Sequence, residues 1–469
     1  MNIEKIGTLG ELKASGWSSK SIRQELRDNV IDKIAKRESI FPKIAGYDET
    51  VLPQIEAALI AGHDIILLGE RGQGKSRIVR SLISLLDEYI PYVAGSEIFD
   101  DPYSPVSKYS VQMIAEEGDA TPIEWLHRSR RYAEKLATPD TSMADLIGDI
   151  DPIRIAEGRY MSDELTIAFG LVPRTNRGIF AINELPDLSE RIQVGLLSIL
   201  EERDVQIRGY RVSMPLDIVL IATANPEDYT NRGRLITPLK DRFGSQIRTH
   251  YPQSVEIELA IVDFETTSVP YRGNEPYFPP YLRELVATIS QVAREASFIS
   301  QRSGVSVRAT ISNYEAIEAA AIRRSLISEA EKAVCRLSDF WVVVSSMAGK
   351  IEIDASDDSD SISVIPKLIS RAVLEVFRRH VALDQVKGVT QYFEGGTEVS
   401  VGAENSDEDL LSLYNSIPDL KAVVDRIEPN EEREAKIAAV EFILDGMHQS
   451  KRLNKYEDGG MMLYARRSR

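Results

Sequence analysis

The chain has 469 residues, enough for roughly two to four domains, and its 43% hydrophobic and 28% charged residues are typical of a globular protein. Its net charge of −17 opposes unspecific attraction to nucleic acid or to an anionic membrane. For this reason we do not expect nucleic acid to be its partner. A single cysteine, Cys335, excludes an intramolecular disulfide, and no segment reaches the length of a membrane span. We therefore expect a cytoplasmic protein.

An amphipathic helix is predicted near the N-terminus, within a leader of residues 1–40. From Ser19 to Glu38 the apolar residues recur at helical spacing after a serine N-cap. The predicted apolar stripe comprises Ile22, Leu26, Val30, Ile31 and Ile34. We expect this stripe to pack against a domain or a neighbouring molecule.

An α/β domain is predicted over residues 41–252. After a second predicted helix, residues 48–61, short aliphatic strands and helices alternate as far as about Tyr251, the order of a doubly wound parallel sheet. The first strand, residues 64–68, is aliphatic and bounded by glycines, which is typical of a strand buried on both faces.

The octapeptide that follows this strand, GERGQGKS, matches the phosphate-binding pattern G-x-x-x-x-G-K-[ST] and leads into a predicted helix. Its glycines let successive backbone N–H groups converge on an anion, toward which the helix points its positive dipole end. Lys75 is expected to reach the β- and γ-phosphates of ATP, and the Ser76 hydroxyl to bind Mg²⁺. The predicted nucleotide-binding residues are Gly69, Glu70, Arg71, Gly72, Gln73, Gly74, Lys75 and Ser76.

A second apolar strand, residues 179–182, leads into an acidic residue at the sheet edge where open α/β folds bind ligands. P-loop ATPases place two acidic residues here, of which the first steadies Mg²⁺ and the second polarises the attacking water. Glu184 occupies the second position, but Asn183 occupies the first. A neutral amide accepts hydrogen bonds from metal-bound water and adds no negative charge beside the ion.

Asn183 therefore predicts weaker magnesium binding or slower turnover, and its replacement by aspartate is expected to raise hydrolysis. A nucleotide switch that does not hydrolyse ATP is the alternative interpretation. We favour hydrolysis because Glu184 remains as a base that can orient water. The predicted metal ligands are Ser76 and Asn183.

A third predicted strand also ends in a polar residue, which we expect at the same edge of the sheet as Glu184. The segment from Leu216 to Tyr229 is apolar as far as Asn225, whose amide is suited to hold the attacking water or the γ-phosphate. Taken alone, this residue also fits a turn asparagine before Pro226. The two preceding motifs favour a place in the nucleotide site.

Helices are predicted after the α/β domain. Residues 253–385 carry apolar residues at helical spacing, which predicts an all-helical lid domain. The acidic run at 354–361 is interpreted as a solvated loop. Residues 386–469 are predicted to form a polar linker, residues 394–409, and a helical C-terminal extension.

Together these motifs resemble the AAA+ ATPases of the magnesium chelatase I-subunit and MoxR type, from about Phe41 to Val381. The segments that carry the resemblance are FPKIAGYDET, GERGQGKS, LIGDIDPIRIAEGRY, RTNRGIFAINEL, ATANPED, LKDRFG and GVSVRATISNYE. The resemblance implies a P-loop AAA+ core with a helical lid, and it implies ATP hydrolysis.

The resemblance also implies three roles around the phosphates. It assigns Asn225 as sensor 1 and Arg242 as the arginine finger that reaches the ATP of the adjacent subunit. It assigns Arg308 as the sensor 2 arginine of the lid. Each guanidinium would offset charge on the γ-phosphoryl oxygens.

Outside the phosphate site, the resemblance places Ile44 and Ala45 in the adenine pocket. It places family insertions at two further sites, the segment from Ile147 to Leu171 and the hairpin-like segment from Val205 to Leu216. The first insertion is where the resemblance implies contact with a partner.

An arginine finger that acts in trans implies a ring, most often a hexamer. The implied function is a Mg-ATP-hydrolysing ring ATPase that remodels or activates a protein partner, usually a von Willebrand factor A-type protein in this family. The alternatives are the ATPase subunit of a chelatase that inserts Mg²⁺ into a porphyrin, and a nucleotide-gated scaffold with little hydrolysis. A DNA-directed motor is disfavoured by the acidic balance and by the lack of a basic stripe.

Overall fold

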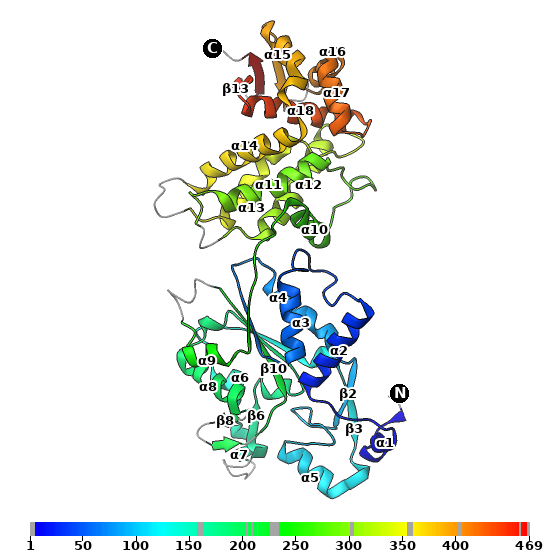
Figure 1. Ribbon diagram of the computed structural model, residues 1–469, viewed down its shortest axis with the longest axis vertical. Coiled ribbons are helices and arrows are strands. Elements are labelled where there is room, and N and C mark those ends of the chain that lie inside the picture. Colours follow the sequence, from blue (N-terminus) through cyan, green and yellow to red (C-terminus); the bar gives the residue numbers. More distant parts are fainter. Residues whose placement is uncertain are drawn as a thin grey trace. The chain divides into compact units, whose positions relative to one another are not determined.

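The computed structural model describes residues 5–156, 164–202, 205–207, 210–212, 214–225, 234–300, 304–353, 360–401, 406–458 and 461–466. The chain divides into two compact units, Met1–His250 (unit 1) and Tyr251–Arg469 (unit 2), shown in Figure 1. In the described ranges, no helix is both long enough and apolar enough to cross a membrane.

A five-stranded parallel sheet forms the centre of unit 1, with the strand order β11-β1-β10-β7-β4. Its strands are β1 (Ile65–Leu68), β4 (Tyr132–Leu136), β7 (Gly178–Asn183), β10 (Ile218–Ala224) and β11 (Ser245–Arg248). The doubly wound parallel sheet predicted from the sequence is confirmed.

Helices cover both faces of this sheet (Figure 1). One face carries α2 (Ile22–Lys36), α3 (Val51–Ala61) and α4 (Lys75–Ser81), and the other carries α6 (Met143–Leu146), α8 (Glu190–Glu202) and α9 (Thr237–Arg242). Side chains of β1 alternate between two hydrophobic clusters, with Ile65 and Leu67 in one and Ile66 in the other. The strand is therefore buried on both faces, which explains its continuous aliphatic sequence.

The predicted leader helix is α2, and it belongs to unit 1. Ser21 is its N-cap and accepts a hydrogen bond from the backbone N–H of Gln24. Three apolar residues one helical turn apart, Ile22, Leu26 and Val30, are buried against α3 and the sheet. The predicted stripe is wrong at its C-terminal end, because Ile31 and Ile34 are 48% and 43% exposed.

The expected simple alternation of strands and helices fails between α4 and β4. There the chain forms β2 (Tyr89–Val93) and β3 (Ile123–His127), which pair antiparallel with each other and not with the central sheet. Helix α5 (Lys108–Glu117) connects them, and α1 (Leu9–Ala14) lies beside them through a bridge between Thr8 and Pro122. A continuous alternation was expected because local periodicity does not show which strand pairs with which.

Both expected insertions contain antiparallel strand pairs. The first holds β5 (Gly148–Ile150), α7 (Pro152–Ala156) and β6 (Ile167–Phe169), with β5 paired to β6. Residues 157–163 of this insertion lie outside the described residues. The second is the predicted hairpin, β8 (Val205–Ile207) with β9 (Tyr210–Val212).

Unit 2 has one hydrophobic core that runs through both the predicted lid and the predicted C-terminal extension. Phe377 of the lid and Phe442 of the extension lie in it together, with ring centroids 6.3 Å apart. Its helices are α10 (Val255–Glu265), α11 (Pro280–Glu295), α12 (Val307–Ile327), α13 (Val343–Met347), α14 (Ser361–His380), α15 (Lys387–Glu394), α16 (Ser406–Ser416), α17 (Pro418–Ile427) and α18 (Arg433–Gln449).

The predicted C-terminal extension is helical over α16, α17 and α18, but it also contains a small sheet that was not predicted. The strands β12 (Val399–Val401), β13 (Leu453–Asp458) and β14 (Met461–Arg466) form an antiparallel sheet in the order β12-β14-β13. The sequence does carry a strand signal there, since two apolar-polar segments flank Asp458-Gly459-Gly460. Leu453 and Tyr464 are buried in the core of unit 2, which explains why these strands form.

A buried ion pair joins α2 to the rest of unit 1. The guanidinium of Arg131 donates to both carboxylate oxygens of Glu25 at 2.7 and 2.5 Å, and its Nε donates to the carbonyl of Arg177 at 2.9 Å. Glu25 also accepts from the backbone N–H of Asp87 at 2.7 Å. Both charged side chains are at most 5% exposed, so each depends on the other for its charge compensation.

Replacing Glu25 with glutamine should lower the free energy of unfolding of unit 1 by about 3 kcal/mol, because Arg131 then stays buried without an anionic partner. Urea unfolding of the full chain measures this value. The matched control is Asp32→Asn, which breaks an ion pair with Lys36 whose side chains are both 58% exposed, and it should cost less than about 0.5 kcal/mol. Equal losses in the two variants would contradict this explanation.

Candidate nucleotide-binding site

The glycine-rich loop lies between β1 and α4, as the sequence predicts. Gly72 and Gly74 have φ angles of 76° and 74°, a region that favours glycine. Gly69 is needed for a different reason, because a Cβ atom there would lie 1.9 Å from Oγ1 of Thr249. The sequence and the fold thus agree on a tightly curled loop before the N-terminus of a helix.

Side chains from three segments hold this loop in place. The Gln73 Oε1 atom accepts hydrogen bonds from the backbone N–H of Glu70 at 3.1 Å and from the Thr249 hydroxyl at 2.6 Å. The Tyr47 hydroxyl lies 2.7 Å from the carbonyl oxygens of Gln73 and His250. Burial raises the pKa of Tyr47 to about 12, so its hydroxyl keeps the proton that it donates.

A line of hydrogen bonds connects the three predicted motifs. The Lys75 Nζ atom lies 2.8 Å from the carbonyl of Glu70 and 2.9 Å from Oδ1 of Asn225. The amide nitrogen of Asn225 in turn donates to Oε2 of Glu184 at 2.9 Å. The ammonium of the loop, the amide after β10 and the carboxylate after β7 therefore meet at one point.

Parallel pairing explains this meeting. Leu68 of β1 pairs with Ala224 of β10, and Ala222 of β10 pairs with Ile182 of β7, so the strands end at the same edge. Glu184 begins the next turn with a φ of 55°, a conformation that is uncommon for a residue with a side chain. Its backbone N–H donates to the Thr223 hydroxyl at 3.1 Å.

Asn183 lies beside the loop and has partners at both ends of its amide. Its Oδ1 atom accepts from the Ser76 hydroxyl at 3.5 Å and from the Thr223 hydroxyl at 3.3 Å, while its nitrogen donates to the carboxylate of Glu134. Glu134 belongs to β4, and sequence reasoning did not single it out. Arg80 of α4 donates to both of its oxygens, at 2.7 and 2.9 Å.

The ion pair keeps Glu134 charged. Hydrogen bonds from the Arg80 guanidinium, more than any other cause, hold the pKa of the Glu134 carboxyl below its ordinary value. Tyr132 also donates to this carboxylate, at 3.1 Å. Alternation along β4 places Tyr132 and Glu134 on the same face of the strand. This alternation is the only feature of the sequence that could have suggested a polar group there.

The other predicted residues belong to other segments of the chain. Ile44 lines a cavity of about 460 Å³ beside α4, together with Phe41 and Arg77, and Ala45 follows it in the chain. Arg242 is the last residue of α9 and its side chain is exposed. Arg308 is exposed near the start of α12 and belongs to unit 2.

The strand order, the loop and the residues at the sheet edge define a P-loop nucleotide-binding protein of the AAA+ type. The family model described as "AAA domain (dynein-related subfamily)" matches residues 123–243, which include β7, α8, β10 and α9. This stretch covers the second and third predicted motifs and the predicted arginine finger.

Curated relatives give the same assignment. The chain is 28% identical to the magnesium-chelatase subunit ChlI of Oryza sativa subsp. indica over 47% of this chain and 55% of that protein. It is 29% identical to the magnesium-chelatase 38 kDa subunit of Rhodobacter capsulatus over 49% of this chain and 61% of that protein. A solved complex of the magnesium-chelatase subunits BchI and BchD aligns with 70% of this chain at 20% identity, with a TM-score of 0.36 that adds nothing to the assignment.

These similarities support the predicted resemblance to the AAA+ ATPases of the magnesium chelatase I-subunit and MoxR type. The chain spans little more than half the length of the curated relatives that it matches.

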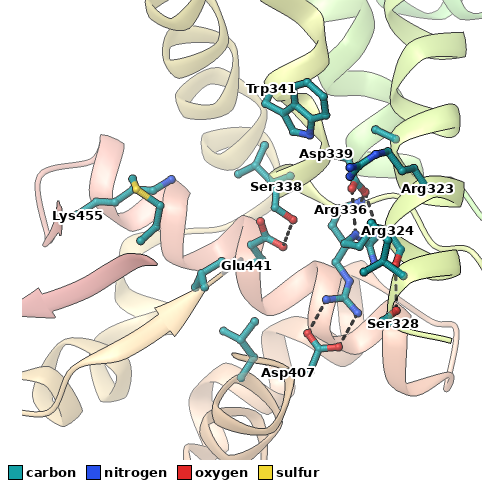
Figure 2. A pocket seen from close by; sticks show the side chains of 16 residues that line it. Arg323, Arg324, Ser328, Arg336, Ser338, Asp339, Trp341, Asp407, Glu441 and Lys455 are labelled. Carbon is teal, nitrogen blue, oxygen red and sulfur yellow. Dashed lines mark hydrogen bonds and ion pairs between the residues drawn. The ribbon is translucent and has the colours of Figure 1, made fainter. Parts of the chain in front are cut away.

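Unit 2 contains a second, separate cavity of about 580 Å³ (Figure 2). Four of the charged residues that line it form two ion pairs. Arg336 donates to Asp407 at 2.6 and 3.0 Å, and Arg324 donates to Asp339 through two nitrogens, both at 2.9 Å. Glu441 accepts one hydrogen bond, from a serine hydroxyl at 3.3 Å. Burial raises the pKa of Glu441 to about 7, although the nearby arginines lower it.

This raised pKa makes the stability of unit 2 depend on pH. In the folded chain Glu441 keeps its proton up to about pH 7, whereas the unfolded chain releases it near 4.5, so stability falls as the pH rises between these values and then levels off. Glu441→Gln removes this titration. Its free energy of unfolding relative to wild type should therefore rise by about 3 kcal/mol between pH 4.5 and about pH 8.

Urea unfolding at the two pH values measures this difference. The Glu331→Gln variant serves as the control, because it removes a carboxylate of unit 2 that lies at the surface. A difference between Glu441→Gln and wild type that stays constant with pH would show that Glu441 does not titrate in this way.

Proposed function

We propose that the chain hydrolyses Mg-ATP as a subunit of a ring, and that it uses this turnover to remodel or activate a protein partner. The observation that carries the proposal is the hydrogen-bonded line from Lys75 through Asn225 to Glu184 at the edge of the sheet. It joins a cation suited to phosphates, an amide suited to the γ-phosphate or the water, and a carboxylate suited to orient that water.

In this proposal Glu184 is the catalytic base. Its carboxylate accepts a hydrogen bond from the attacking water and so orients a lone pair of the water oxygen toward the γ-phosphate. Asn225 is the sensor, because its amide contacts both Lys75 and Glu184 and so links the position of the phosphate to that of the base. Lys75 and the N–H groups of the loop balance the phosphate charge.

Ser76 and Asn183 fit a magnesium ion. Their oxygen atoms are 3.5 Å apart. Adjacent oxygens around an octahedral Mg²⁺ lie about 3 Å apart, because each Mg–O bond is about 2.1 Å long, so Asn183 would contact an ion at Ser76 through a metal-bound water. Among the described residues no group of three or more His, Cys, Asp or Glu side chains could hold a metal, so the phosphates and water would supply the other ligands. When bound there, the ion would neutralise charge that develops on the phosphate oxygens.

The cavity beside α4 is our candidate for the base of the nucleotide. Ile44 gives it an apolar wall and Arg77, two residues after the loop lysine, reaches the same space. Ala45 extends this wall in the proposal. Because adenine is flat and largely apolar on its faces, an aliphatic surface next to the phosphate loop suits it.

Two arginines complete the proposed site from other parts of the assembly. Arg242 is exposed at the end of α9, as a finger that reaches into the neighbouring subunit would need to be. Arg308 is exposed on α12, as a sensor 2 arginine would need to be before a nucleotide binds. A finger in trans requires a closed ring, for which we propose a hexamer.

The partner is proposed to be a protein, with a von Willebrand factor A-type protein as the first candidate. The named relatives are magnesium-chelatase subunits, and this favours a second candidate function, the ATPase subunit of a metal chelatase. A third candidate, a nucleotide-gated scaffold, rests on the neutral Asn183. A measurement of ATP hydrolysis separates the scaffold from the other two candidates. Identification of the bound partner separates the remodelling ATPase from the chelatase subunit.

Glu184→Gln should bind ATP with wild-type affinity but release phosphate at least about a hundredfold more slowly, because the water loses its base. Phosphate release and binding of a fluorescent ATP analogue measure the two effects. The matched control is Glu190→Gln, an exposed glutamate nearby in the chain, which should leave both unchanged.

Wild-type rates in Glu184→Gln would overturn the role of this base. Tight ATP binding by the wild-type chain without phosphate release would favour the scaffold. Because Glu184→Gln holds the ATP state, it is also the bait for capturing a partner.

Mixed rings test the finger in trans. Adding Arg242→Ala subunits to wild-type subunits should lower ATPase activity more steeply than dilution, because each altered subunit also disables the site of its neighbour. Steady-state ATPase activity across a series of mixing ratios measures this effect, with the exposed Arg234→Ala as the control. A strictly proportional loss would contradict a shared site.

A further inference from the structure

The two ends of the Asn183 amide have different partners. Its oxygen faces the hydroxyls of Ser76 and Thr223, while its nitrogen faces the carboxylate of Glu134. Asn183 is only 9% exposed, so water cannot easily replace these partners. Which end of the amide faces Ser76 decides whether a cation at this hydroxyl meets an oxygen or an N–H group.

Only Glu134 determines that orientation. The hydroxyls of Ser76 and Thr223 can each donate or accept a hydrogen bond, and therefore tolerate either end of the amide. An ionised carboxylate can only accept, so the NH₂ group of Asn183 must face Glu134 and the oxygen must face Ser76. The conclusion follows from the chemistry of the three partners.

Glu134 is itself held in place. The Arg80 guanidinium donates hydrogen bonds to both carboxylate oxygens of Glu134, and the Tyr132 hydroxyl donates to one of them at 3.1 Å. In the register of the two strands Glu134 pairs with Ala181, and Leu136 pairs with Asn183, so Glu134 and Asn183 point to the same face of the sheet. Arg80 belongs to α4, the helix that begins with the loop lysine, so its hydrogen bonds tie Glu134 to the helix that follows the phosphate loop.

We propose that Glu134 is a positioning residue of the magnesium site, which turns the oxygen of Asn183 toward the ion at Ser76. The inference rests on the proposed function, because it needs Mg-nucleotide to bind at Ser76. A carboxylate on the neighbouring strand thus takes over part of the task of the acidic residue that is absent from position 183.

The proposal changes what Asn183→Asp is expected to do. An aspartate at this position would place a second carboxylate against Glu134, with no amide hydrogen to bridge them, and like charges at this distance repel. The sequence predicts that Asn183→Asp raises ATP hydrolysis. This increase should therefore appear fully only when Glu134 is neutralised as well.

Glu134→Gln tests the proposal, because glutamine keeps the shape but can both donate and accept, and so no longer selects one orientation of Asn183. The magnesium concentration for half-maximal binding of a fluorescent ADP analogue should rise about tenfold, as is typical when the partner of a metal ligand is lost. Binding of the same analogue in EDTA should not change. The exposed Glu88→Gln is the matched control and should leave the magnesium midpoint unchanged.

In the Asn183→Asp background, Glu134→Gln should lower the magnesium concentration for half-maximal binding and not raise it. Asn183→Asp/Glu134→Gln should need less magnesium than Asn183→Asp alone, since one of two adjacent carboxylates is removed. Arg80→Gln, which loosens Glu134 without touching Asn183, should raise the magnesium midpoint by less than Glu134→Gln does.

Equal shifts of Glu134→Gln in both backgrounds, or an unchanged midpoint in the wild-type background, would overturn the positioning role. If the wild-type chain binds nucleotide without any dependence on magnesium, the proposed function fails and not this inference alone. If the wild type depends on magnesium and Glu134→Gln behaves like it, only the inference fails.

Discussion

Parallel pairing in register between β1, β10 and β7 is the constraint on which the nucleotide site depends. Each strand is buried on both faces and contributes one short aliphatic segment, and each is followed by one polar residue or loop. Because the strands run the same way and end together, their ends deliver Lys75, Asn225 and Glu184 to one edge. A slip of register by one residue would turn the side chains of a strand to the opposite faces and separate this group.

The fourth strand, β4, adds what the neutral Asn183 lacks. Its Glu134 is tied to α4 by Arg80 and to β7 by Asn183, so the phosphate loop, its helix and two strands share one group of hydrogen bonds. The group is selective because a carboxylate can only accept hydrogen bonds, so it fixes which end of the amide faces it. An amide thereby acquires a defined orientation beside the phosphate loop.

Unit 2 is built around one core, although its sequence reads as a lid, a linker and an extension. Phe377 and Phe442 pack in the same cluster, and the strands that follow α18 close over it with Leu453 and Tyr464. The cavity of this unit is lined by the ion pairs Arg336–Asp407 and Arg324–Asp339 and by the buried Glu441. The extension therefore contributes to the stability of the lid, whatever partner the assembly has.

The sequence by itself determined the phosphate loop, the strand character of its flanks and the polar residues at three strand ends, because glycine spacing and aliphatic runs are local features. It also indicated the family, which depends on the order of such motifs. Only the tertiary structure decided that β2 and β3 pair with each other, that β12, β13 and β14 form a sheet, and that Glu134 faces Asn183. These facts depend on contacts between segments far apart in the chain, and periodicity within one segment carries no information about its distant partner.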